Sequence, residues 1–233
     1  MENEGWLKQW EQLQNNENDL VIDKENGLDL IQNKMPVPRN IKEALRGSHR
    51  KQWREALDLE YGSLIDNGAW TLVRLPPGRK ALPCPWVLVV KYHANGVVER
   101  FKARLVAQGN HQEFGVDCDE VYAPVARFES LRLVLAVGTI LDCHIHQMDV
   151  HTAFLNGTMD KDQRIYMRQP PGYHVPGKED LVCELQKSIY GLKQAPRIWY
   201  RVLHEFLTKM GFVRCNKEYC IYVQKGELNG SLW

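Results

Sequence analysis

The sequence predicts an α+β fold in which an antiparallel sheet packs against helices. Apolar residues recur at helical spacing in three segments, after Ser48, after Glu129 and after Pro196. Short runs of β-prone residues lie between them and end at turn signals such as Asn95-Gly96. With 233 residues and 44% hydrophobic content, the chain can bury a sizeable core in one domain or in two closely packed subdomains.

Helices are predicted first along the chain. Asn40 followed by Glu43 indicates one helix start, and Ser48 precedes a longer helix that ends at Asn67-Gly68. The apolar positions of the longer helix are Trp53, Leu57, Tyr61 and Leu64. Strands follow at residues 70–73, 86–92 and 97–106, with a Pro-Pro-Gly turn after the first and Asn95-Gly96 joining the other two into a hairpin.

The second half of the chain repeats this alternation of helices and strands. A helix is predicted at residues 129–141, with Leu131, Val134, Leu135 and Thr139 toward the core. Strands are predicted at residues 144–150, 165–167 and 220–223, and a turn at 226–230. Between the last two strands, Pro196 begins a helix that Gly211 ends. Its apolar positions are Trp199, Leu203, Phe206, Leu207 and Met210.

Charge is distributed unevenly, although the net charge is only +1. Residues 1–38 are acidic and end at Pro36-Val37-Pro38, which predicts a disordered leader before a folded unit at residues 39–233. The start of the chain lacks the pattern of a signal peptide, and no apolar run is long enough to span a membrane. We therefore expect an intracellular protein, cytoplasmic or nuclear, whose six cysteines are reduced and mostly buried.

A row of cations is predicted on the second hairpin strand. Side chains two positions apart share a face, so Arg100, Lys102 and Arg104 line up opposite Phe101, Ala103 and Leu105. Guanidinium and ammonium groups in a row suit a triphosphate or a nucleic-acid backbone. A solvated outer face of a half-buried hairpin is the alternative interpretation.

Asp149 is the candidate catalytic residue. It ends an apolar run in the segment Gln-Met-Asp-Val-His-Thr-Ala-Phe-Leu-Asn-Gly, with Phe154 five residues later. Phosphoryl transfer by polymerases uses two divalent cations about 4 Å apart, held by carboxylates from neighbouring strand ends, and Asp149 would be the first such carboxylate. The alternative is a turn or cap residue whose oxygen bonds nearby backbone.

Five long strings resemble the reverse transcriptases of copia-like retrotransposons, between residues 41 and 223. They are "ALRGSHRKQWREALDLEYGSLIDNGAWTLVRLPPG", "WVLVVKYHANGVVERFKARLVAQGNHQEFGVDCDEVYAPVAR", "QMDVHTAFLNG", "IYMRQPPGY" and "CELQKSIYGLKQAPRIWY". The resemblance implies the fingers and partial palm of a right-hand polymerase. It also implies an RNA template, a DNA primer and deoxynucleoside triphosphates as partners, possible further Pol segments, and Mg²⁺ or Mn²⁺ as the metal.

The resemblance also implies roles for individual residues. Asp149 and the backbone carbonyl of Val150 would bind the metal, and Phe154 would be the sugar gate that excludes a ribose 2′-hydroxyl. The other nucleotide-binding residues would be Lys102, Arg104, Tyr190, Gly191 and Gln194. Lys193 and Arg197, at the start of the helix that begins near Pro196, would bind nucleic acid, because exposed amides and cations there favour phosphate.

One departure from the family concerns the remaining carboxylates. The related polymerases carry a Tyr-x-Asp-Asp motif that supplies them, and this sequence ends at Trp233 without that string. One carboxylate is too few to assemble two metal ions on a triphosphate, so we expect no polymerisation by this chain alone. The alternatives are a non-catalytic nucleic-acid-binding protein derived from a transposon and a decayed transposon product.

Overall fold

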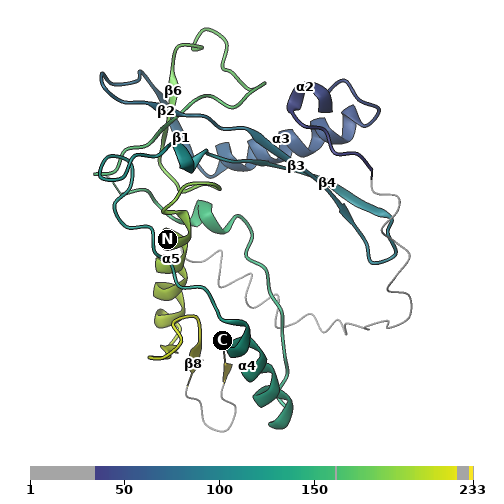
Figure 1. Ribbon diagram of the computed structural model, residues 1–233, viewed down its shortest axis with the longest axis vertical. Helices are drawn as coiled ribbons and strands as arrows, with labels where there is room; N and C mark the ends of the chain where they lie inside the picture. Colours follow the sequence, from purple (N-terminus) through teal and green to yellow (C-terminus); the bar gives the residue numbers. More distant parts are fainter. Residues whose placement is uncertain (1–34, 161, 225–230, 233) are drawn as a thin grey trace.

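The computed structural model describes residues 35–160, 162–224 and 231–232, and its fold is α+β as the sequence predicts (Figure 1). The predicted leader lies outside the described residues up to position 34, and so does the predicted turn at 226–230. The helices are α2 (Ile41–Ala44), α3 (Arg50–Asp66), α4 (Phe128–Ile140) and α5 (Ala195–Lys209), with short 3-10 helices η1 (Gly109–His111) and η2 (Ala153–Asn156). The strands are β1 (Trp70–Val73), β2 (Ala81–Leu82), β3 (Trp86–Tyr92), β4 (Val98–Leu105), β5 (Tyr166–Met167), β6 (Val182–Leu185), β7 (Val213–Arg214), β8 (Tyr222–Gln224) and β9 (Ser231–Leu232).

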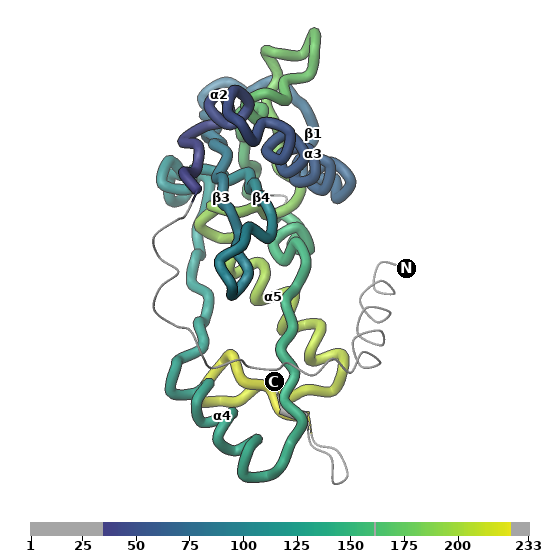
Figure 2. Tube along the Cα trace, turned by 90° about the vertical axis from the view of Figure 1, so that its right-hand side faces the viewer, coloured from purple at the N-terminus to yellow at the C-terminus, as the bar shows by residue number. Residues whose placement is uncertain are grey.

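The described strands form three sheets. The largest has the order β1-β6-β5-β2. Its β1–β6 and β5–β6 pairs are antiparallel as predicted, whereas its β2–β5 pair is parallel and corrects the prediction. The β3–β4 hairpin and the β7-β8-β9 sheet are antiparallel. Figure 2 shows α2 and α3 near one end of an elongated molecule and α4 at the other end.

The hairpin formed by β3 and β4 confirms the predicted alternation. Its turn carries Gly96 at φ +79°, and the Val97 backbone N–H donates to Asn95 Oδ1 at 3.1 Å. Glycine suits that left-handed backbone because it has no Cβ. The apolar face of β4 packs against α3, where Trp53 and Phe101 meet edge to face with ring centroids 4.8 Å apart.

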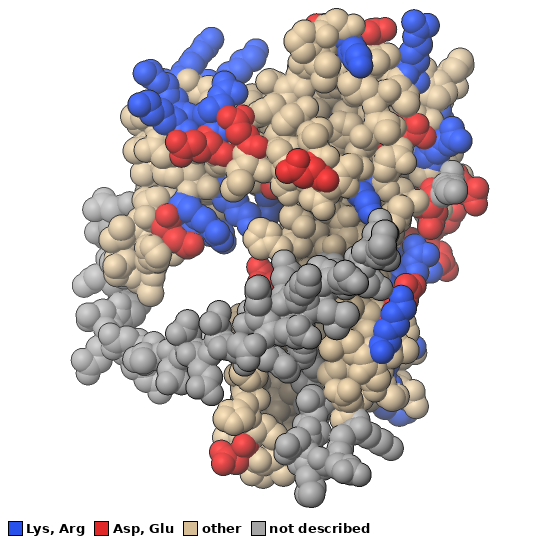
Figure 3. Space-filling view, turned by 180° about the vertical axis from the view of Figure 1, so that it is seen from behind, with Lys and Arg blue, Asp and Glu red and all other residues tan. Residues whose placement is uncertain are grey.

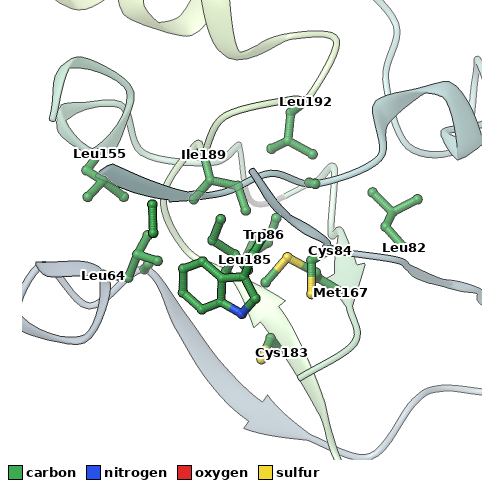
Figure 4. Close-up of a cluster of buried hydrophobic side chains, with 14 of the residues drawn as sticks. Leu64, Leu82, Cys84, Trp86, Leu155, Met167, Cys183, Leu185, Ile189 and Leu192 are labelled. Atoms are coloured by element: carbon green, nitrogen blue, oxygen red, sulfur yellow. The ribbon is translucent and has the colours of Figure 1, made fainter. Parts of the chain in front are cut away.

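The main core lies where α3, the hairpin and the largest sheet meet. Figure 4 shows side chains from β3, β5 and β6 converging with Ile189 and Leu192 of the chain that follows β6. Ile165 and Met167 are fully buried. Two thiols, Cys84 and Cys183, also lie in this core, and burial raises the pKa of each to about 12. All described cysteines carry free thiols. Cys118 is also buried, whereas Cys143 is exposed.

The predicted strand at residues 144–150 is wrong. The segment is irregular, and within the described chain no strand pairs with it. Extended backbone becomes a strand only when a neighbour satisfies its N–H and C=O groups, which an alternating pattern does not guarantee. The predicted alternation of faces around Asp149 therefore does not apply.

The helix α4 is confirmed, but its predicted packing is wrong. Leu131 and Leu135 are 51% and 41% exposed, Thr139 is also exposed, and Val134 is half-buried. Helical periodicity identifies the apolar side of a helix and does not show that another element covers it. None of the helices in the described chain is long and apolar enough to cross a membrane.

A substitution in α4 tests this placement. Leu133 is 63% exposed, so we expect Leu133→Gln to change the free energy of unfolding by no more than about 0.5 kcal/mol. Urea titration followed by circular dichroism would measure the change. Leu57→Ala, at a fully buried position of α3, is the control for a core loss. A loss in Leu133→Gln as large as that in Leu57→Ala would show that α4 packs into a core.

Candidate functional site

Three predicted nucleotide-binding residues come together from three separate parts of the chain. Arg104 of β4 places its Cζ atom 5.2 Å from the ring centroid of Tyr190, in the chain between β6 and α5. Phe154 of η2 meets the same tyrosine edge to face, with centroids 4.7 Å apart. We call Arg104, Tyr190 and Phe154 the Tyr190 stack. A guanidinium over an aromatic face is attractive, and such a stack presents a cation beside two rings.

Backbone hydrogen bonds hold Tyr190 beside the end of β4. The Ala107 N–H donates to the Tyr190 carbonyl oxygen at 2.8 Å, and the Gly109 N–H donates to the Gly191 carbonyl oxygen at 3.2 Å. The two glycines permit this close approach. A Cβ atom on Gly109 would lie 2.2 Å from the Gly191 oxygen, and one on Gly191 would lie 2.0 Å from the Ala107 oxygen.

Ser188 holds Phe154 in a similar way. Its hydroxyl, fully buried, donates to the Phe154 carbonyl oxygen at 2.6 Å, and its backbone N–H donates to the Gly157 carbonyl oxygen at 2.9 Å. A Cβ on Gly157 would lie 2.2 Å from Ile198 Cγ2, so η2 sits directly against α5. The position of the Phe154 ring is therefore tied to the same chain segment that carries Tyr190.

The basic row of β4 leads to this stack. This row consists of Arg100, which is exposed, and of Lys102 and Arg104, which are half-buried. Across the hairpin, Arg100 pairs with Lys91, Lys102 with Val89 and Arg104 with Val87. Burial lowers the pKa of Lys102, and the neighbouring Arg104 and Arg100 lower it further. Figure 3 shows Lys and Arg side chains, with acidic ones among them, over the part of the molecule that holds α2, α3 and the hairpin.

Glu60 of α3 lies beside this row and was not predicted from the sequence. Its Oε1 accepts a hydrogen bond at 3.3 Å from the Leu105 N–H of β4. Burial raises the pKa of Glu60, while this hydrogen bond and the charges of Lys102 and Arg104 act in the opposite direction. Desolvation prevails, so the pKa of Glu60 lies above its ordinary value in the folded chain.

The raised pKa of Glu60 predicts a pH-dependent stability. A carboxyl group with a raised folded-state pKa supports folding most below its ordinary value of 4.5 and loses that contribution as pH rises through the folded-state value. We expect Glu60→Gln, which keeps the acceptor for Leu105, to gain stability over wild type as pH rises from 4 to 7. Denaturant midpoints at several pH values would measure this gain. Glu55→Gln, on an exposed position of the same helix, should not show it.

The remaining predicted binding residues have partners within the protein. Gln194 is 3% exposed and its Nε2 donates to the Asp117 carbonyl oxygen at 2.9 Å. Lys193 is exposed, and its Nζ donates to the Gln112 carbonyl oxygen at 3.1 Å. Arg197 is ion-paired with Glu120. Each of these three side chains therefore already has a partner in the structure.

Asp149 lies away from regular structure. It is exposed on the irregular segment before η2, and Val150 next to it is half-buried. Thr152 follows in the left-handed region at φ +49°, which is unusual for a β-branched residue. Across residues 35–160, 162–224 and 231–232, no three or more His, Cys, Asp or Glu side chains form a group that could hold a metal ion. These described residues do not fit a two-metal site.

Several residues of the site carry no local sequence signal. Ser188 and Gln112 act through long-range hydrogen bonds, which no periodic pattern indicates. In the sequence, Glu60 is not distinguished from the other charged residues of its helix. Gly191 was predicted from the resemblance, but its contact with Gly109 was not, because that contact joins segments far apart in sequence.

Comparison with known proteins identifies the class of protein to which this α+β domain belongs. Residues 67–232 match the family of reverse transcriptases (RNA-dependent DNA polymerases). Over 188 residues, or 81% of the chain, the sequence is 40% identical to the Retrovirus-related Pol polyprotein from transposon TNT 1-94 of Nicotiana tabacum. Over 192 residues, or 82% of the chain, it is 40% identical to the Retrovirus-related Pol polyprotein from transposon RE1 of Arabidopsis thaliana. No solved structure matches the chain.

The chain is thus a polymerase domain by class. More narrowly, it belongs to the reverse transcriptase family, and its sequence is similar to part of the Pol polyproteins of copia-like transposons. The matches cover 14% and 13% of the two polyproteins named above, so the chain spans about one seventh of their length. Reverse transcriptases as a family require a divalent metal and act on nucleic acids.

Proposed function

We propose that this chain binds the incoming deoxynucleoside triphosphate of a reverse transcriptase, with RNA as template and DNA as primer. The observation that carries the proposal is the Tyr190 stack at the end of the basic row. Lys102 and Arg104 would hold the phosphates, because a guanidinium fork and an ammonium group both pair with phosphate oxygens. Phe154 would lie against the sugar and leave no room for a 2′-hydroxyl.

The hairpin with α3 corresponds in this proposal to the fingers of a right-hand polymerase, and α5 with η2 to part of its palm. Tyr190 and Gly191 would line the nucleotide pocket between these parts through backbone and ring. Gln194 supports the pocket through its buried amide, rather than by touching the nucleotide. Lys193 and Arg197, at the start of α5, would contact the template once Arg197 leaves Glu120.

Asp149 is the carboxylate proposed for catalysis, with the Val150 carbonyl beside it. Among the described residues, no group of three or more His, Cys, Asp or Glu side chains could hold Mg²⁺ or Mn²⁺. The chain alone would therefore bind nucleotide and nucleic acid without joining them. Further segments of a Pol polyprotein are the partners that would supply the remaining carboxylates.

Two measurements on the purified chain test this function. Titration calorimetry should detect binding of dATP and of an RNA–DNA template and primer, with the affinity for the duplex falling as salt rises. Primer extension on an RNA template with Mg²⁺ should give no product. Absence of nucleotide binding by a cooperatively folded chain would contradict the binding proposal. Extension that Asp149→Ala abolishes would contradict the expectation that the chain alone is inactive.

A further inference from the structure

A pair of buried glutamine side chains joins the segment after β4 to the start of α5. Gln112 and Gln194 are 5% and 3% exposed. Gln112 Nε2 donates to Gln194 Oε1 at 2.9 Å, and Gln112 Oε1 accepts from the Lys193 backbone N–H at 2.8 Å. One side chain therefore holds two consecutive residues of the loop that follows Tyr190.

The loop at residues 190–194 is held at both of its ends. The backbone bonds from Ala107 and Gly109 hold Tyr190 and Gly191, and the Gln112 amide holds Lys193 and Gln194. All of these partners belong to the segment at residues 107–117. Removing the Gln112 amide would loosen the second end, which the bonds of Gln194 Nε2 to Asp117 and of Lys193 Nζ to the Gln112 carbonyl would still hold. It would also leave the buried Gln194 oxygen without its donor, which costs more than losing an exposed hydrogen bond.

The Tyr190 ring belongs to this loop and contacts residues of two other parts of the chain. Phe154 touches that ring edge to face, and Arg104 lies over its face. A binding constellation keeps its selectivity only if supporting residues hold it within about 0.5 Å, and loops need such support more than helices or strands do. A shift of Tyr190 would give the Phe154 ring room to move away from the sugar.

We propose that Gln112 is a positioning residue that sets the sugar selectivity of the nucleotide pocket. It acts through the loop at residues 190–194 on Tyr190, and through Tyr190 on Phe154. The inference rests on the proposed function, in which Phe154 excludes the ribose 2′-hydroxyl. Gln112 itself does not touch the nucleotide in this account.

A merely structural role for Gln112 would lower stability and leave selectivity unchanged. Gln169 offers a matched control, because it is also 5% exposed and its amide makes three hydrogen bonds. Its partners are the backbone of Val175, Lys178 and Leu181, none of which belongs to the Tyr190 stack. Gln112→Met and Gln169→Met remove comparable buried amides with little change in side-chain volume.

The experiment measures dissociation constants of dATP and ATP for wild type, Gln112→Met and Gln169→Met by titration calorimetry. Gln112→Met should lower the ratio of the ATP constant to the dATP constant by about tenfold, the scale of one lost buried hydrogen bond. Gln169→Met should leave this ratio at the wild-type value. Without nucleotide, amide hydrogen exchange at residues 188–194 should rise in Gln112→Met and not in Gln169→Met.

The outcomes separate the inference from the proposed function. A wild-type ratio in Gln112→Met, or an equal fall in both variants, would overturn the inference alone. A folded wild-type chain that binds neither nucleotide, or binds both equally, would overturn the pocket or its sugar gate and the inference with it. If Gln112→Met fails to fold, Gln112→Glu takes its place. That variant keeps the acceptor for Lys193 and should show an intermediate ratio, and an unchanged ratio would overturn the inference.

Discussion

Gly191→Ala should destabilise the chain severely and abolish nucleotide binding. The residue has φ +92°, and an added Cβ would lie 2.0 Å from the Ala107 oxygen and 2.6 Å from Val106 Cγ1. The left-handed backbone costs about 1–2 kcal/mol for a residue with a Cβ. Separating the two backbones also breaks the hydrogen bonds of Ala107 to Tyr190 and of Gly109 to Gly191, so we expect a total loss on the order of 4 kcal/mol.

Two other glycines separate the causes of this loss. Gly115 has φ +80° with no atom within 4 Å of an added Cβ, so Gly115→Ala reports the backbone cost alone. Gly109→Ala measures the cost of the steric contact, because its Cβ would lie 2.2 Å from the Gly191 oxygen. Urea unfolding of the three variants should rank Gly115→Ala as the mildest. Equal losses in Gly191→Ala and Gly115→Ala would show that the two segments do not approach closely.

The second large effect is expected on triphosphate binding. Replacing both Lys102 and Arg104 by Ala should weaken dATP binding by at least about a hundredfold, because each charge-assisted hydrogen bond contributes about 1.5–3 kcal/mol. Arg104→Lys should fall between wild type and Arg104→Ala. It keeps the charge but loses the planar fork that lies over Tyr190. Titration calorimetry at two salt concentrations would measure these affinities.

Arg132 provides the matched control for the loss of Arg104. It also lies over an aromatic ring, with its Cζ 5.9 Å from the Phe128 centroid, but it belongs to α4. Arg132→Ala should leave the dATP affinity unchanged. If the double variant at Lys102 and Arg104 binds dATP within twofold of wild type, the basic row does not hold the phosphates. A similar loss in Arg132→Ala would indicate a general charge effect instead.

Local structure was predictable from the sequence where neighbouring residues suffice to form it. The longer helix after Ser48, now α3, ends at Asn67 and Gly68 as expected, and the two hairpin strands lie within one residue of their predicted bounds. The strand at residues 144–150 failed because a strand needs a partner that its own pattern cannot supply. The packing of α4 failed for a related reason, since an apolar side does not identify what covers it.

The candidate site was predictable only in part. Resemblance to the family selected Arg104, Phe154 and Tyr190, and the structure brings these three side chains into contact. Their roles in binding a nucleotide stay a prediction. The supporting residues were missed, because Gln112 and Ser188 act through buried hydrogen bonds that have no periodic signature.

The sequence by itself determined the helices, the hairpin, the alternation of the basic row and the family. These depend on residues close together in the chain or on long ordered strings. Only the tertiary structure decided which loop meets which. Gln112 and Gln194 are 82 positions apart, and Ser188 and Phe154 are 34 apart. Such pairs form when the packed core brings distant segments together, so no local pattern specifies them.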